Sequence, residues 1–140
     1  MPRRPAGTLQ WMDLTSPHAE ELRAFYAAVV GWKSTPLDMG GYEDHCMAPP
    51  GGGDPQAGIC HARGSNAGQP GGWIPYVMVD DLDASIAEAE RLGGEAATAV
   101  RGDAATGRFA VIRDPHGNTL ALYEDPGPVE LAKEEGERTG

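Results

Sequence analysis

The stretch that most constrains the fold runs from Gly107 to Glu124, GRFAVIRDPHGNTLALYE. Its middle, residues 114–118, predicts a tight turn, because Pro115 pre-sets its own backbone angle and Gly117 tolerates a positive φ. The apolar runs on either side of the turn are typical of paired strands. The sequence therefore predicts a hairpin that gives a leucine face to the core and a second face, around Ala121, to a cavity.

Length and composition predict one globular domain and argue against two classes of partner. The 140 residues suffice for one domain with its own core. A net charge of −10 disfavours nucleic acid and anionic membrane surfaces as partners. No apolar run approaches the roughly 20 residues of a membrane span, and the basic residues 1–5 lead into no secretory signal. With only Cys46 and Cys60 in the chain, a reduced, cytoplasmic setting is expected.

The first half of the chain predicts a strand, a helix and three strands. Ser16 is suited to cap the helix, Pro17 to its first position, and Gly31 to its end. The apolar stripe at helical spacing consists of Leu22, Phe25, Tyr26, Val29 and Val30. Strands are expected over residues 8–14, 32–37, 42–47 and 56–63.

The second half repeats this order. Asp80-Asp81 is expected to cap a helix that Gly93-Gly94 ends, and a strand over residues 73–79 precedes it. A strand over residues 95–101 and the closing hairpin follow. The pattern predicts an α+β fold of two βαβββ modules in a single domain, residues 8–124. The expected segments are a flexible arm (1–7), module one (8–63), module two (73–124) and an acidic, solvated tail (125–140).

Three segments together resemble the glyoxalase/bleomycin-resistance/dioxygenase family, also called the vicinal oxygen chelate family. The hairpin is similar to its strand, D-P-x-G-N turn and final strand. Residues 25–32, FYAAVVGW, are similar to F-Y-x-x-V-x-G-W, and residues 76–94, YVMVDDLDASIAEAERLGG, continue the match. The resemblance spans residues 7–124. It implies two modules around a small-molecule cavity, often across a dimer, so a homodimer is expected.

The resemblance also implies where a metal would bind. Metal-using members hold a divalent ion with His, Glu or Gln on the first and last strand of each module, where it acts as a Lewis acid. The matching positions here are Gln10, then Cys60 or His61, then Ile74 and Ala121. Isoleucine and alanine cannot bind a metal, and the His-His-Glu set of extradiol dioxygenases is absent. We therefore expect no metal ion and no other cofactor.

A different metal site would need His45, Cys46, Cys60 and His61 to gather on adjacent strands. No closely spaced pair supports it, and neighbours along a strand face opposite ways. The simpler interpretation makes both cysteines small buried residues and His45 a surface residue of its strand.

The candidate ligand-binding residues form an apolar wall with a few polar groups. The wall consists of Ile74, Tyr76, Met78, Ala121 and Tyr123, with Met12 added from the first module. Cys60 and His61 are further candidates, and Gln10 would orient a ligand or satisfy a buried backbone group. His61 is a candidate general base if it points into the cavity, and otherwise a strand-end histidine bonded to a loop. The alternative for the wall is ordinary core.

We expect a small-molecule-binding protein that needs no metal and holds a partly aromatic organic ligand in the cavity between modules. The rival function is a metal-dependent lyase, isomerase or dioxygenase that uses Gln10 and His61. A protein-interaction module is a third function, with the acidic surface as its only support. The residues assigned to the core alone are Phe25, Tyr26, Val29, Leu82, Ile86, Leu120 and Leu122.

Overall fold

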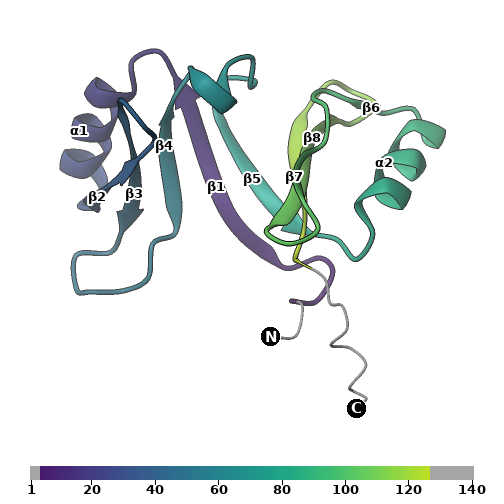
Figure 1. Cartoon of the computed structure of the whole chain (residues 1–140), viewed down its shortest axis with the longest axis horizontal. Coiled ribbons are helices and arrows are strands. Elements are labelled where there is room, and N and C mark those ends of the chain that lie inside the picture. The colour runs from purple at the N-terminus through teal and green to yellow at the C-terminus, as the bar shows by residue number, and fades with distance from the viewer. Residues whose placement is uncertain (1–3, 127–140) are drawn as a thin grey trace. The chain divides into compact units, whose positions relative to one another are not determined.

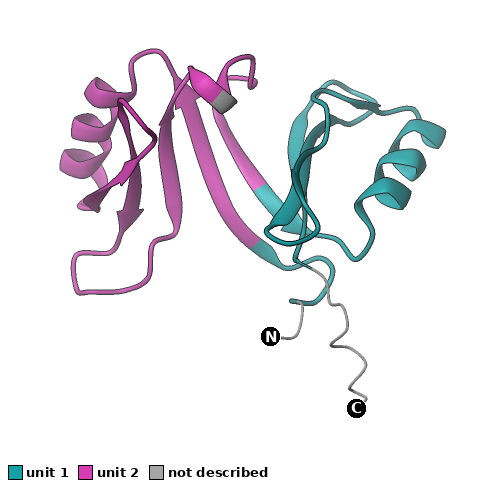
Figure 2. Cartoon of the chain, viewed as in Figure 1, with its two compact units in different colours: residues 1–9, 76–140 teal, residues 10–75 magenta. Residues whose placement is uncertain are grey.

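A computed structural model describes residues 4–126, apart from the side chain of Ser65. It confirms an α+β fold with two α-helices and many strands (Figure 1). The chain divides into two compact units: unit 1 holds residues 1–9 and 76–140, and unit 2 holds residues 10–75 (Figure 2). Most of the expected tail, from residue 127 onward, lies outside the described residues, as do residues 1–3.

Unit 2 is a four-stranded sheet with one helix. Its elements are β1 (Leu9–Ser16), α1 (Ala19–Val30), β2 (Lys33–Asp38), β3 (Glu43–Ala48), β4 (Ala57–His61) and a short 3-10 helix, η1 (Gly64–Asn66). The strands lie in the order β2-β3-β4-β1, with β1 parallel to β4 and the other pairs antiparallel. Pro36 lies in β2, at the edge of this sheet, where the proline's missing N–H is tolerated.

The core of unit 2 lies between α1 and one face of its sheet. The fully or nearly buried members of this core are Leu14, Ala19, Met47, Ala57 and Ile59. Leu22, Tyr26 and Met12 pack against them. Two residues assigned to the core from sequence are instead exposed, Phe25 at 53% and Val29 at 65%. The buried stripe follows positions 19, 22, 26 and 27, and at 3.6 residues per turn positions 25 and 29 lie beside it.

The start of α1 differs from the prediction. His18, rather than Ser16, is the residue that precedes the helix, and no side chain caps it. The hydroxyl of Ser16 instead accepts a hydrogen bond from the backbone N–H of His18, at 3.0 Å. The end of the helix is as predicted: Gly31 adopts a left-handed conformation and donates its N–H to the carbonyl of Ala27.

Unit 1 contains the remaining strands and one α-helix. Its elements are β5 (Trp73–Met78, whose first residues belong to unit 2), α2 (Leu82–Arg91), β6 (Glu95–Ala96), β7 (Arg101–Asp103), β8 (Gly107–Arg113) and β9 (Thr119–Glu124). The strand order is β5-β9-β8-β6, and β7 also pairs with β8. β5 runs parallel to β9, and the other pairs are antiparallel.

Two predictions about unit 1 are confirmed and one is wrong. The hairpin of β8 and β9 forms around Asp114, and Asp81 caps α2 by accepting from the N–H of Ala84. The single strand expected over residues 95–101 is two short strands, β6 and β7. The chain between them is held by the Thr98 hydroxyl, which accepts the N–H of Val111 in place of a backbone carbonyl.

The described part of the expected arm is bonded within unit 1. Arg4 donates to the carboxylate of Asp125 through its backbone N–H at 2.9 Å and its guanidinium at 2.6 Å. Gly7 donates to the carbonyl of Met78, and Met78 donates to that of Thr8. Within residues 4–126, no helix has the length and apolar character to cross a bilayer.

Candidate functional site

Among residues 4–126, no helix covers one face of the unit 1 sheet. α2 packs on the other face, where Glu124 accepts the backbone N–H of Leu82 at 2.8 Å. Because side chains alternate along each strand, the register places two rows on the face away from α2. We call this surface the helix-free face of unit 1. Its rows are Tyr76, Ala121 and Val111, and Met78, Tyr123 and Phe109.

Four residues of the predicted wall therefore share this face, and aromatic rings dominate it. The ring centroids of Tyr76 and Phe109 are 5.7 Å apart, and Tyr76, Met78 and Ala121 are all buried. Phe109 and Val111 were not among the predicted ligand-binding residues, although strand alternation around Ala121 places them there. Ile74 is buried too, in the part of β5 that belongs to unit 2. Phe109 and Tyr123 are only partly buried, so their rings are the part of this face that a flat apolar group can contact.

The hydroxyl of Tyr123 is held by its own neighbourhood. It donates to the carbonyl of Thr106 at 3.2 Å. Gly107 allows this approach, since a Cβ at that position would lie 2.1 Å from the hydroxyl oxygen, and its φ is +101°. Burial raises the pKa of the Tyr123 phenol, with a smaller contribution from the charge of Asp125. The phenol is therefore a neutral hydrogen-bonding group at neutral pH.

The first strand places its side chains differently from the predicted site. Met12 packs into the core with Leu14, and Gln10 lies on the same side of the strand, with its buried Oε1 lacking a hydrogen-bond partner among the described residues. Trp11 and Asp13 lie on the opposite side, where the indole N–H donates to the Asp13 carboxylate at 2.6 Å. We call that side the helix-free face of unit 2.

Gly58 makes room for this pair. It lies opposite Asp13 in the parallel register, and a Cβ there would be 2.3 Å from Asp13 Oδ1. Strand alternation in the sequence predicted that Trp11 and Asp13 lie on one face of β1 and that Met12 and Leu14 lie on the other. The alternation alone did not predict which face of β1 α1 would cover.

Both cysteines lie on the helix-free face of unit 2 as free thiols. Cys46 pairs with Gly58 across the strands, and Cys60 is two residues further along β4. Burial, followed by the nearby carboxylates of Asp13 and Asp44, raises the pKa of both thiols, that of Cys60 strongly. Neither is a ready nucleophile or thiolate ligand at neutral pH.

His61, the last residue of β4, is bound by a buried carboxylate rather than by a loop. Asp44 on β3, only 3% exposed, accepts the His61 backbone N–H at 2.8 Å and lies 3.2 Å from His61 Nδ1. The other carboxylate oxygen accepts from the side chain of Asn66 at 3.2 Å. Asp44 lies just beyond the last paired residues of β3 and β4, His45 and Ile59, so its carboxylate replaces a backbone acceptor where the strands separate.

His45 is not the surface residue expected from sequence. It is buried, and its Nε2 lies 2.7 Å from Glu20 Oε2 in the first turn of α1. Hydrogen bonding to His45 lowers the pKa of the Glu20 carboxyl. The reason is strand alternation, which turns His45 with Met47 toward α1.

Gln10 and His61 are not brought together within unit 2. Ser16 is the register partner of His61, and Gln10 lies six residues earlier on the same strand. At about 3.3 Å per strand residue, this separation is about 20 Å. The two side chains cannot share one ligand atom or one metal ion in this chain.

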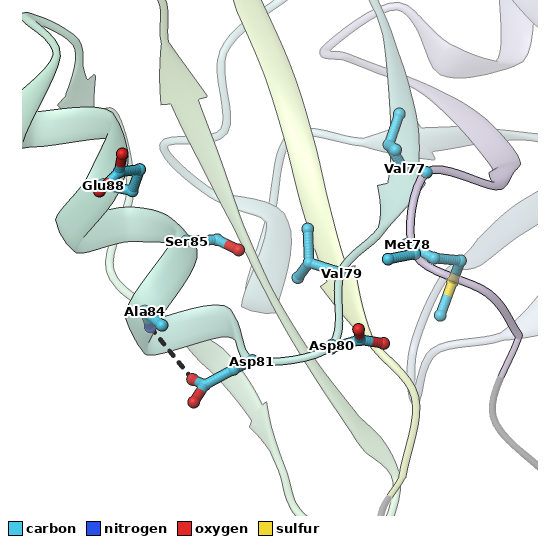
Figure 3. Close-up of a pocket in the computed structure, with 10 residues that line it drawn as sticks. Val77, Met78, Val79, Asp80, Asp81, Ala84, Ser85 and Glu88 are labelled. Carbon is cyan, nitrogen blue, oxygen red and sulfur yellow. Dashed lines mark hydrogen bonds between the residues drawn. The ribbon is translucent and has the colours of Figure 1, made fainter.

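A groove of about 580 Å³ lies beside the start of α2 (Figure 3). Apolar side chains at the end of β5, Val77 and Met78, and just after it, Val79, form one side, and Ser85 and Glu88 of α2 form another. The Asp81 carboxylate at its rim is used to cap the helix. Met78 is its only predicted site residue.

Comparison with known proteins decides the family. The family model described as a glyoxalase-like domain matches residues 11–123, which include both α-helices and nearly all of the strand residues. The chain belongs to this family. The resemblance inferred from the hairpin and the two helix segments is therefore confirmed.

Relatives of this glyoxalase-like chain are roughly twice its length. CFP32 of Mycobacterium tuberculosis, which is named as a glyoxylase, is 32% identical over 122 residues, covering 87% of this chain and 45% of CFP32. The anthracycline biosynthesis protein DnrV of Streptomyces peucetius is 28% identical over 138 residues, covering 88% of this chain and 49% of DnrV. The chain spans about half the length of these relatives.

A solved structure supports the fold. Methylmalonyl-CoA epimerase from Mycobacterium tuberculosis superimposes with a TM-score of 0.54 at 21% identity, covering 94% of this chain and 97% of the epimerase. At that identity the likeness concerns the fold.

The residues of this glyoxalase-like domain do not fit the metal of metal-using members. Ile74 and Ala121 have no side-chain donor atoms. The position on β4 offers only the Cys60 thiol, which stays protonated at neutral pH, or the His61 imidazole about 20 Å from Gln10. Among residues 4–126, no three His, Cys, Asp or Glu side chains are arranged to hold an ion. No chemical step is therefore derived through a metal.

Proposed function

We propose that this glyoxalase-like chain binds a small organic molecule with a flat, aromatic portion, and that it does so without a metal ion. The observation that supports this most strongly is the helix-free face of unit 1, where Tyr76, Met78 and Phe109 lie around Ala121. Apolar and aromatic contact area is the main source of affinity for such ligands, and a few polar groups set their orientation. The name of DnrV adds support, since anthracyclines contain fused aromatic rings.

Trp11 offers a further aromatic ring, on the helix-free face of unit 2. Its ring is fixed by the hydrogen bond to Asp13, so ordering it on binding costs little entropy. The chain has two other tryptophans, Trp32 and Trp73, whose ring centroids lie 5.9 Å apart. Both pack against the core under α1. Tryptophan fluorescence can therefore distinguish binding at the helix-free face of unit 2 from changes in the core of that unit.

The test is a fluorescence titration with anthraquinone-2-sulfonate as the probe. We expect saturable quenching in the wild-type chain and in Trp32→Phe. In Trp11→Phe the quenching signal should be largely lost, because the quenched ring is gone. Equal quenching of wild type and Trp11→Phe, or none in wild type, would count against the proposal.

A second titration tests the wall in unit 1. In Ala121→Leu the added volume fills the middle of a buried row, so the dissociation constant should rise about tenfold or more if the fold is kept. Far-UV circular dichroism and the unfolding midpoint provide the fold check. An unchanged dissociation constant in a folded variant would place the ligand elsewhere.

The rival function, an enzyme that uses Gln10 and His61 together, has less support because these residues lie far apart on β1 and β4. His61 alone retains a geometry suited to acid–base chemistry.

A further inference from the structure

The hydrogen bonds of His61 determine which ring nitrogen accepts a proton. An ionised aspartate only accepts hydrogen bonds, so Nδ1, 3.2 Å from Asp44 Oδ1, carries the hydrogen of the neutral ring. Nε2 is then the basic nitrogen. Within residues 4–126 it has no hydrogen-bond partner, and the side chain is 18% exposed. A bound molecule can therefore reach it.

Asp44 is well placed to keep the His61 ring in the tautomer that carries its hydrogen on Nδ1. Its carboxylate is buried and is fixed by the His61 backbone and the Asn66 side chain, in addition to the ring. The neighbouring ring of His45 lies 6.3 Å away between centroids, but its Nε2 is already bound to Glu20. Of these two neighbouring imidazoles, only that of His61 has its outer nitrogen available.

A cation is held next to this base. The ring of Tyr42 meets the His61 ring edge-on at 5.5 Å, and the guanidinium carbon of Arg63 lies 4.2 Å from the Tyr42 centroid. Tyr42 also donates its hydroxyl to the Arg63 carbonyl at 3.1 Å. Gly64 is needed here, since a Cβ would lie 2.5 Å from that hydroxyl.

Arg63 has no carboxylate partner among the described residues, unlike Arg4, Arg108 and Arg113. A guanidinium binds a carboxylate with two parallel hydrogen bonds. The combination of an available guanidinium and an oriented imidazole suits a small organic acid that loses a proton.

We propose that His61, Asp44 and Arg63 form a proton-transfer site for a small carboxylate that bears a carbonyl group, an activity beyond the ligand binding proposed above. Arg63 binds the carboxylate. His61 Nε2 forms an N–H bond with a proton from the carbon next to the carbonyl. The electron pair of the broken C–H bond passes into the enolate, and return of the proton restores both ring and substrate. Asp44 is a positioning residue that sets the tautomer and stabilises the imidazolium.

The test follows hydrogen–deuterium exchange at the methyl group of pyruvate in D₂O by proton NMR, using the whole chain. Wild type should exchange the methyl protons about a hundredfold faster than His61→Gln. His116→Gln, a matched change of an exposed histidine in the hairpin turn, should equal wild type. Equal rates in wild type and His61→Gln would overturn the proposal, and so would the absence of exchange in wild type.

Two further variants separate positioning from binding. Asp44→Asn should lower kcat at least about tenfold with little change in KM, because the substrate does not contact Asp44. Arg63→Gln should mainly raise KM. The ¹⁵N chemical shifts of the wild-type imidazole give a measurement independent of any variant's folding: Nδ1–H is expected, and Nε2–H would overturn the proposal. Loss of pyruvate exchange with intact anthraquinone-2-sulfonate binding would contradict this activity alone.

Discussion

At the scale of single residues, aspartates organise the places where strands end. The Asp44 carboxylate accepts hydrogen bonds from His61 and Asn66 at the end of β4, and the Asp114 carboxylate accepts hydrogen bonds within the turn between β8 and β9. Asp114 accepts hydrogen bonds from the backbone of His116 and from the backbone and side chain of Asn118. In each case a short acceptor replaces backbone carbonyls that the turning chain directs elsewhere.

The Asp114 turn should make the free energy of unfolding decrease at acid pH. Hydrogen bonding to the Asn118 side chain, then to backbone N–H groups, lowers the pKa of the Asp114 carboxyl. A lowered folded-state pKa stabilises the fold above the ordinary aspartate value of about 3.9, and this contribution is lost as pH falls through the folded value. Asp114→Asn removes the titration.

The measurement is the unfolding midpoint in urea of both proteins between about pH 5 and about pH 2. Wild type should lose more stability than Asp114→Asn across that window. Parallel curves would show that the turn contributes no acid-dependent stability.

At the scale of elements, Glu124 joins the end of β9 to the start of α2. Its carboxylate accepts from the Leu82 backbone and from Arg108, which also reaches Asp83. Glu124→Ala should cost about 2–3 kcal/mol, because it leaves a buried N–H and a guanidinium without this acceptor. Asp83→Ala removes only an exposed partner and should cost less than about 1 kcal/mol.

Urea unfolding gives both energies, and hydrogen exchange at the Leu82 amide reports the contact itself. Exchange at that amide should be faster in Glu124→Ala and unchanged in Asp83→Ala. Equal stability losses in the two variants would mean that the buried contact is no stronger than the exposed one.

Many of the boundaries of helices and strands could be predicted from sequence. Glycine and proline positions located the hairpin turn and the end of α1, and Asp81 identified the start of α2, because these residues act through local backbone geometry. The face of β1 that packs under α1 could not be predicted in this way. Alternation separated Trp11 and Asp13 from Gln10 and Met12, but which side α1 covers depends on contacts between distant residues.

The same limit applies to Asp44 and His61. They are 17 residues apart and meet only because β3 and β4 pair and then separate. No spacing rule in the sequence marks such a pair. Conversely, Phe25 and Val29 fit an apolar helix pattern that local reasoning assigned to the core, whereas the packing of α1 leaves them exposed.

At the scale of the whole molecule, the chain is a glyoxalase-like domain without a suitable set of metal ligands in its described residues. The homodimer expected from the family resemblance stays a prediction, and sedimentation velocity would test it by giving the mass of the species in solution. Metal independence is the central claim, because it separates this chain from metal-using members that share its fold.

The most direct test is elemental analysis of the purified chain together with a titration of anthraquinone-2-sulfonate before and after treatment with a chelator. The account predicts less than stoichiometric divalent metal and the same dissociation constant in both titrations. One bound metal per chain, with probe binding lost on chelation and restored by that metal, would contradict it.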